Sequence, residues 1–213
     1  MNRRTFCAVT AVLSLTVASA AGAQQASWGP GADDTAFATM LQASFRNAGR
    51  VTVERLKQDE TQAFCSDPQL ATSKAAAKQA EAIEAANLAS VKWPSDGKWL
   101  GDWKSGERIA QSGRGLTWTD SPTQASGGNC YNCHQIDAKE ISHGTIGPSL
   151  HQYRKLKGGT EQVMRETWAK IYNSKSSNAC SNMPRAGHMG ILKETELQDI
   201  MALLLDPESP VNK

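Results

Sequence analysis

The residues best suited to chemistry are Cys130, Cys133 and His134, which stand together in the stretch Cys-Tyr-Asn-Cys-His. This C-x-x-C-H pattern is the attachment signature of a c-type haem. Each cysteine can add through its sulfur to one haem vinyl group, and the two residues between them match the separation of the vinyls. The histidine is then placed under the iron as its proximal ligand. We therefore expect Cys130 and Cys133 to anchor one haem c and His134 to bind its iron.

Two other interpretations of this motif have weaker support. A zinc site would require a second C-x-x-C or an H-x-x-x-H, and the sequence contains neither. A thioredoxin-like redox pair would require a βαβ pattern around the motif, which this region lacks.

Helical patterns surround the motif and would position it. An amphipathic helix is expected over 102–112, closed by Gly113, and a loop rich in Gly, Ser and Thr follows to residue 129. A second helix is expected to begin at Thr160, and a final one spans 193–205. The final helix has a broad apolar face, which contains Leu197, Ile200, Met201, Leu203, Leu204 and Leu205.

A helix ahead of C-x-x-C-H, with a final apolar helix that crosses it, resembles the class I cytochromes c. The resemblance implies an all-α fold of that class around one covalently bound haem. It also implies that the Pro148 carbonyl of Gly147-Pro148 accepts a hydrogen bond from the haem histidine. In such cytochromes the distal ligand is a methionine on a loop, often before proline. Met183-Pro184 fits this description, and we predict Met183 as the second iron ligand.

Several other side chains near the expected haem have weaker claims to a role. Met189 and His188 compete with Met183, whereas Met164 is expected in the core because it lies on a helix face. Trp168 would either donate to a haem propionate or lie in the core, and Arg185 would either meet a propionate or be solvated. Two loop histidines are expected to face solvent rather than iron, namely His143 and His151.

The first 96 residues divide into an export signal and a helical extension. Arg3, Arg4, an apolar run to Ala20 and an A-x-A site predict that residues 1–23 are a signal peptide that is removed. Export unfolded is favoured over the twin-arginine route, because haem attachment needs an accessible motif. The expected location is the periplasm. Residues 24–96 are expected to be helical, with helices from Asp33–Asp34 to Gly49, around Leu56 and Phe64, and over 74–91. A class I cytochrome c domain with a C-terminal tail would then occupy 97–213.

Charge and cysteine usage narrow the expected partners and cross-links. The net charge of +2 gives no argument for nucleic acid, and no apolar run reaches the length of a membrane span. Removing residues 1–23 takes away Cys7 and leaves Cys65 and Cys180 beside the haem cysteines. In the oxidising periplasm such a pair predicts a disulfide, which would tie the extension to the loop that carries Met183.

The domain further resembles SoxX, the mono-haem subunit of the SoxAX cytochromes of bacterial thiosulfate oxidation. The stretches that carry the resemblance are GERIAQSGRG (106–115), GGNCYNCH (127–134), GTIGPSL (144–150), MPR (183–185) and ALLLDPESPVN (202–212). The last is the most telling, because a generic cytochrome has no reason to carry it.

The resemblance implies an electron-transfer role within a heterodimer. A SoxA-like haem subunit would join thiosulfate oxidatively to a cysteine of the SoxYZ carrier, as an L-cysteine S-thiosulfotransferase. This chain would accept the electrons and pass them to a small cytochrome c, with no catalytic residue of its own. The main alternative is a free-standing periplasmic electron shuttle unrelated to sulfur oxidation. A haem-based sensor and a dithiol oxidoreductase are further alternatives, and the Met-Pro loop argues against the sensor.

Overall fold

The computed structural model describes residues 35–67 and 74–213, and within them the chain is helical with one isolated bridge between Ala48 and Val51. The predicted signal peptide and the Asp33–Asp34 cap lie outside these residues. No helix of the described part is long and apolar enough to cross a membrane. The α-helices are α1 (Thr35–Ser44), α2 (Glu60–Cys65), α3 (Lys74–Ala89), α4 (Trp103–Gln111), α5 (Tyr153–Lys157), α6 (Glu161–Tyr172) and α7 (Glu194–Leu205). Short 3-10 turns occur at Val53–Leu56, Cys130–Asn132, Ser174–Ser176 and Pro210–Asn212.

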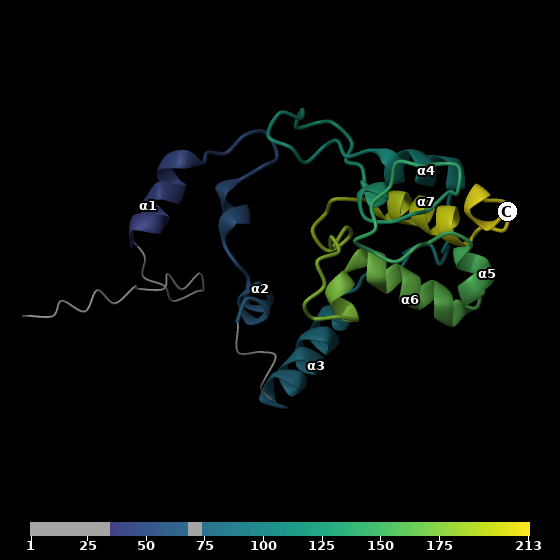
Figure 1. Cartoon of the computed structure of the whole chain (residues 1–213), viewed down its shortest axis with the longest axis horizontal. Helices are drawn as coiled ribbons and strands as arrows, with labels where there is room; N and C mark the ends of the chain where they lie inside the picture. The colour runs from purple at the N-terminus through teal and green to yellow at the C-terminus, as the bar shows by residue number, and fades with distance from the viewer. Residues whose placement is uncertain (1–34, 68–73) are drawn as a thin grey trace, which may run out of the picture.

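Helices α4 and α7 lie against each other, as predicted for the first and last helices of the cytochrome domain (Figure 1). The crossing is close because Gly106 has no side chain. A Cβ atom there would collide with the backbone carbonyl of Asp199 on α7. Beside it, the Asp102 N–H donates to the Asp199 carboxylate at 2.8 Å, and the Gly101 N–H donates to the Gln198 carbonyl at 2.9 Å. Asp102 also caps α4, since its carboxylate accepts from the N–H groups of Lys104 and Ser105.

The core forms between α7, α6 and the segment before α4. All six apolar residues predicted for the buried face of α7 are buried. Helix α6 begins at the predicted cap, where the Thr160 side chain accepts from the Val163 N–H, and it buries Met164 as expected. Trp168 is 1% exposed, and its indole N–H donates to the Lys92 carbonyl at 2.8 Å. Of the two roles considered for Trp168, the structure therefore supports the core role.

The C-terminal tail closes the end of α7, a role that the sequence did not predict. The last carbonyls of a helix lack partners within it. Here Ser209 donates to the Leu203 carbonyl at 2.5 Å, and the Asn212 amide donates to Leu204 and Asp206 at 3.0 and 2.9 Å. Arg154 on α5 donates to the Leu205 carbonyl at 2.7 Å. The tail thus joins α7 to α5, a short helix that sequence patterning also missed.

The extension has the predicted helical character, with shorter elements than expected. The second expected helix divides into the turn Val53–Leu56 and α2, while α3 matches its predicted start and ends at Ala89. Helix α1 lies apart from the α4–α7 group (Figure 1). The end of α3 contacts the cytochrome part, because the Asn173 amide donates to the Asn87 side chain at 2.9 Å and to Ser90 at 3.1 Å. The predicted division at residues 96 and 97 stays a prediction, and contacts cross it.

The helix crossing gives a first testable prediction. Gly106→Ala places a methyl group against the Asp199 backbone, so α4 and α7 must separate. Because overpacking of this kind is destabilising, we expect the free energy of unfolding to fall by about 1–3 kcal/mol, measured by urea denaturation. Lys104→Ala, on the exposed side of the same helix, is the control and should change it by less than about 0.5 kcal/mol. Equal effects of the two substitutions would show that the crossing is not tightly packed.

Candidate functional site: a haem-attachment motif and its methionine loop

The C-x-x-C-H motif forms a tight 3-10 turn anchored to α4. Within it, the N–H groups of Cys133 and His134 both donate to the Cys130 carbonyl, at 3.1 and 2.9 Å. Both cysteines are free thiols, and both are partly buried. The two residues ahead of the turn bind to the end of α4, since the N–H of Gly128 donates to Ile109 and that of Asn129 donates to Ser112. The turn therefore has a fixed place relative to the α4–α7 crossing.

Tyr131, between the two cysteines, fixes the turn from inside the protein. It is 5% exposed, and its hydroxyl donates to the Glu107 carboxylate of α4 at 2.9 Å. The same hydroxyl accepts from the Asp137 N–H at 3.1 Å. Burial raises the pKa of Glu107, and the hydrogen bond from Tyr131 offsets only part of that rise. Sequence patterning did not identify Glu107, which is one polar position on an amphipathic helix.

His134 is oriented as predicted by the loop that follows it. Its Nδ1–H donates to the Pro148 carbonyl at 2.7 Å, since a carbonyl oxygen can only accept. This bond assigns the proton to Nδ1 and leaves Nε2 as the ring nitrogen able to bind a metal. Gly147 lies directly against the imidazole, and a Cβ atom there would collide with the ring. The Gly-Pro pair thus supplies both the space for the ring and its hydrogen-bond acceptor.

Met183 lies on the loop after α6, partly buried and packed against the core. Its backbone is held on both sides, because Ser174 donates to the Met183 carbonyl at 2.6 Å and the Met183 N–H donates to Ser181 at 3.2 Å. Of the competing ligands, Met189 is 56% exposed and His188 is also exposed. A thioether that binds iron must be shielded from water, so this placement favours Met183 over Met189.

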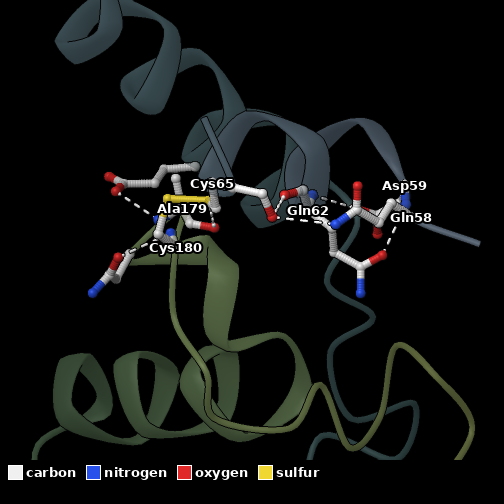
Figure 2. Close-up of a disulfide and its surroundings, with 9 residues drawn as sticks. Gln58, Asp59, Gln62, Cys65, Ala179 and Cys180 are labelled. Carbon is white, nitrogen blue, oxygen red and sulfur yellow. Dashed lines mark hydrogen bonds between the residues drawn. A yellow bond between two sulfur atoms is a disulfide. The ribbon is translucent and has the colours of Figure 1, made fainter. Parts of the chain in front are cut away.

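The predicted disulfide is present and joins α2 to the methionine loop. Cys65 at the end of α2 bonds to Cys180, three residues before Met183, with the two Cα atoms 5.4 Å apart (Figure 2). Beside it, the Ala179 N–H donates to Glu84 of α3 at 3.0 Å. Two helices of the extension therefore hold the start of the loop.

Arg185, two residues after Met183, is also bound to the extension. Its guanidinium pairs with the Asp59 carboxylate at 2.8 Å. This corrects the expectation of a solvated side chain, because Arg185 is 13% exposed and pairs with a protein carboxylate. The propionate contact stays a prediction. Burial alone would raise the pKa of Asp59, but the Gln62 N–H and Arg185 outweigh it and hold that pKa below its usual value. The methionine loop is thus fixed to α2 on both sides of Met183.

The residues present fit a covalently bound haem. They supply two free thiols on one turn, one imidazole whose Nε2 has no hydrogen-bond partner among the described residues, and one thioether on a separate loop that a disulfide and an ion pair hold. The collision that any side chain at position 147 would cause shows that the backbone is shaped around the histidine ring.

Of the loop histidines, His143 contacts the Gly144 carbonyl at 3.3 Å, and His151 has a buried Nδ1 without a hydrogen-bond partner in the described residues.

The half-buried carboxyl of Glu107 gives a prediction of pH dependence. Because folding raises its pKa, stability decreases as pH rises from the ordinary glutamate value, about 4.3, through the folded value. Glu107→Gln keeps an oxygen for Tyr131 and removes the buried charge. We expect the variant to have the higher free energy of unfolding at neutral pH, with the difference vanishing below about pH 4, measured by denaturant titration at several pH values. Glu166→Gln, on the exposed side of α6, should give no such gain; a gain there would contradict the assignment.

Comparison with known proteins agrees with this geometry. A family model described as cytochrome c matches residues 120–206, which include the C-x-x-C-H turn, the methionine loop and α7. An uncharacterized lipoprotein of Aquifex aeolicus (strain VF5) is 38% identical over 165 residues, which cover 73% of this chain and 73% of that protein. The match to the cytochrome c model implies covalently bound haem c and electron transfer. The chain therefore belongs to the same family as this lipoprotein and contains a cytochrome c domain with the all-α class I fold.

Proposed function

We propose that the chain binds a single haem c through Cys130 and Cys133, with His134 and Met183 as the axial ligands of its iron. Three observations support this assignment: the free thiols on one turn, the Nε2 of His134, which has no hydrogen-bond partner in the described part of the chain, and the packing of the partly buried Met183 against the core. Bound haem supplies reversible one-electron chemistry, and a methionine ligand favours the ferrous state and a higher reduction potential. The protein contributes the fixed tautomer of His134 and the rigid backbone around Met183.

We further propose that the protein is the electron-accepting subunit of a SoxAX-type cytochrome. The observation that carries this proposal is how two stretches of the SoxX resemblance fit together. The tail at 202–212 folds back so that the Gln152 N–H donates to Val211 at 2.8 Å and the Arg154 N–H donates to Asn212 at 3.0 Å. Gln152 and Arg154 lie shortly after the stretch GTIGPSL (144–150), whose Pro148 orients His134. The tail therefore supports the haem histidine indirectly, which gives this family feature a physical reason.

The proposed reaction takes place on a partner subunit. The terminal sulfur of thiosulfate would bond to a cysteine sulfur of the SoxYZ carrier; as this bond forms, the thiol proton is released and the two sulfur atoms together lose two electrons. This chain would accept those electrons one at a time and pass them to a small cytochrome c. It would be the non-catalytic subunit of an L-cysteine S-thiosulfotransferase. A periplasmic location agrees with the predicted signal peptide and with the description of the Aquifex relative as a lipoprotein.

The decisive experiment is the native mass of the haem-containing species purified from periplasm, with its subunits identified. We expect a heterodimer with a second haem protein, and reduction of this haem when thiosulfate and the carrier are added. A single haem protein without a partner subunit, whose haem is not reduced when thiosulfate and the carrier are added, would contradict the SoxAX assignment. The free-standing electron shuttle would then be the remaining proposal.

The disulfide gives a separate prediction about the methionine ligand. Replacing Cys65 and Cys180 together with serine removes a cross-link between residues 115 positions apart, which stabilises the native state by about 4–5 kcal/mol at most. We expect a lower melting temperature and, in the ferrous protein, faster binding of carbon monoxide, because a looser loop releases Met183 more often. Ser177→Ala, exposed on the same loop, is the control. A drop in melting temperature with unchanged carbon monoxide binding would show that the bridge does not position Met183.

A further inference from the structure

A polar cleft of about 490 Å³ lies between α2 and the methionine loop. One wall comes from α2 and the residues before it, and the other comes from the loop between Lys175 and Arg185. The Cys65–Cys180 disulfide closes one side. The side chains that line the cleft include Gln62, Lys175, Ser181, Asn182 and Arg185. The cleft has room for a small ligand with part of its hydration shell.

Lys175 is the unusual member of this lining. The residue is only 6% exposed, and its ammonium group has no hydrogen-bond acceptor or ion-pair partner among the described residues. The nearest carboxylate, that of Asp59, is already paired with Arg185 at 2.8 Å. Burial lowers the pKa of Lys175, while the neighbouring Asp59 raises it and Arg185 lowers it. The side chain is thus largely enclosed, and its ammonium group opens to the cleft without an acceptor in the described part of the chain, an arrangement that favours a ligand of opposite charge.

The remaining polar groups of the cleft also favour a ligand that accepts hydrogen bonds. The Gln62 side-chain oxygen is occupied by the Asp59 N–H at 2.8 Å, and Ser181 accepts from the Met183 N–H at 3.2 Å. The donors that a ligand can use are the amide N–H groups of Gln62 and Asn182, the Ser181 hydroxyl and the Lys175 ammonium, while the side-chain oxygens of Gln58 and Asn182 are acceptors. An anion with several oxygens can use these four donors together, and the ammonium disfavours a cation.

We propose that this cleft binds a small divalent oxyanion of the sulfate type, with Lys175 as its main charged contact and Arg185 at the rim. Met183 is part of the cleft lining, but the groups proposed to bind the anion include none of the proposed haem ligands. The proposal therefore goes beyond electron transfer and does not depend on the SoxAX assignment. A haem propionate carries the same oxygen chemistry and is the alternative occupant, which the experiment below distinguishes.

The test uses the full-chain protein with haem bound and sulfate as the probe. Titration calorimetry in a chloride-free buffer should give saturable binding with one sulfate per chain. Lys175→Met, which keeps the aliphatic stem, should weaken that binding by about tenfold or more, as expected for losing a charged hydrogen bond. Lys175→Arg should restore most of it. Lys170→Met, an exposed lysine of α6, is the matched control and should bind sulfate as the parent does. Melting temperatures without sulfate confirm that each variant is folded.

Three outcomes would overturn the proposal. If titration with chloride at equal ionic strength gave the same heat as titration with sulfate, the heat would come from general screening of surface charges and not from a binding site. Equal losses in Lys175→Met and Lys170→Met would remove Lys175 from the site. Absence of sulfate binding, together with a shifted haem reduction potential in Lys175→Met but not in Lys170→Met, would assign the cleft to a haem propionate. The haem absorption spectrum, recorded for the parent and each variant, keeps this proposal separate from the ligand assignment. If Met183 were not an iron ligand, the spectrum of the parent itself would lack the features of methionine ligation, whether or not sulfate binds.

Discussion

The close contact of α4 with α7 at Gly106 is the constraint on which the rest of the structure depends. From α4, the carboxylate of Glu107 and the carbonyl of Ile109 hold the C-x-x-C-H turn. From the other end of α7, the folded tail holds α5 and, through it, the loop that orients His134. Two segments of the site, the C-x-x-C-H turn and the loop with Pro148, are therefore positioned by one helix crossing. A glycine is required there because any side chain would separate the two helices.

The second organising feature is the way the extension holds the methionine loop. The Cys65–Cys180 disulfide precedes Met183 and the Arg185–Asp59 ion pair follows it, and both join the loop to the few residues around α2. A thioether is a weak neutral ligand, so the free energy of keeping it on iron depends on how little freedom the loop gains when it leaves. The extension is thus more than an appendage: it restricts the segment on which the proposed haem environment depends, and it forms one wall of the polar cleft beside it.

Much of this arrangement follows from the sequence, because its signals are local. The C-x-x-C-H spacing, the Gly147-Pro148 pair, the apolar face of α7 and the two cysteines outside the haem motif, Cys65 and Cys180, each imply a contact through chemistry that few residue types provide. The Arg185–Asp59 pair, the Trp168–Lys92 bond and the Glu107–Tyr131 bond were not predictable in this way. Each joins an ordinary polar group to a partner 24 or more positions away, and only the three-dimensional fold selects that partner. The tail at 202–212 was noticed as a family feature, while its role as the cap of α7 required the structure.

The central claim is that Met183 and His134 bind the iron of one haem. The most direct measurement is the proton NMR spectrum of the ferrous full-chain protein, because the methyl group of an axial methionine is shifted strongly upfield by the porphyrin ring current. The account predicts one such methyl signal in the parent and in Met189→Leu, and its loss in Met183→Leu. A signal that persists in Met183→Leu, or that disappears in Met189→Leu, would contradict it.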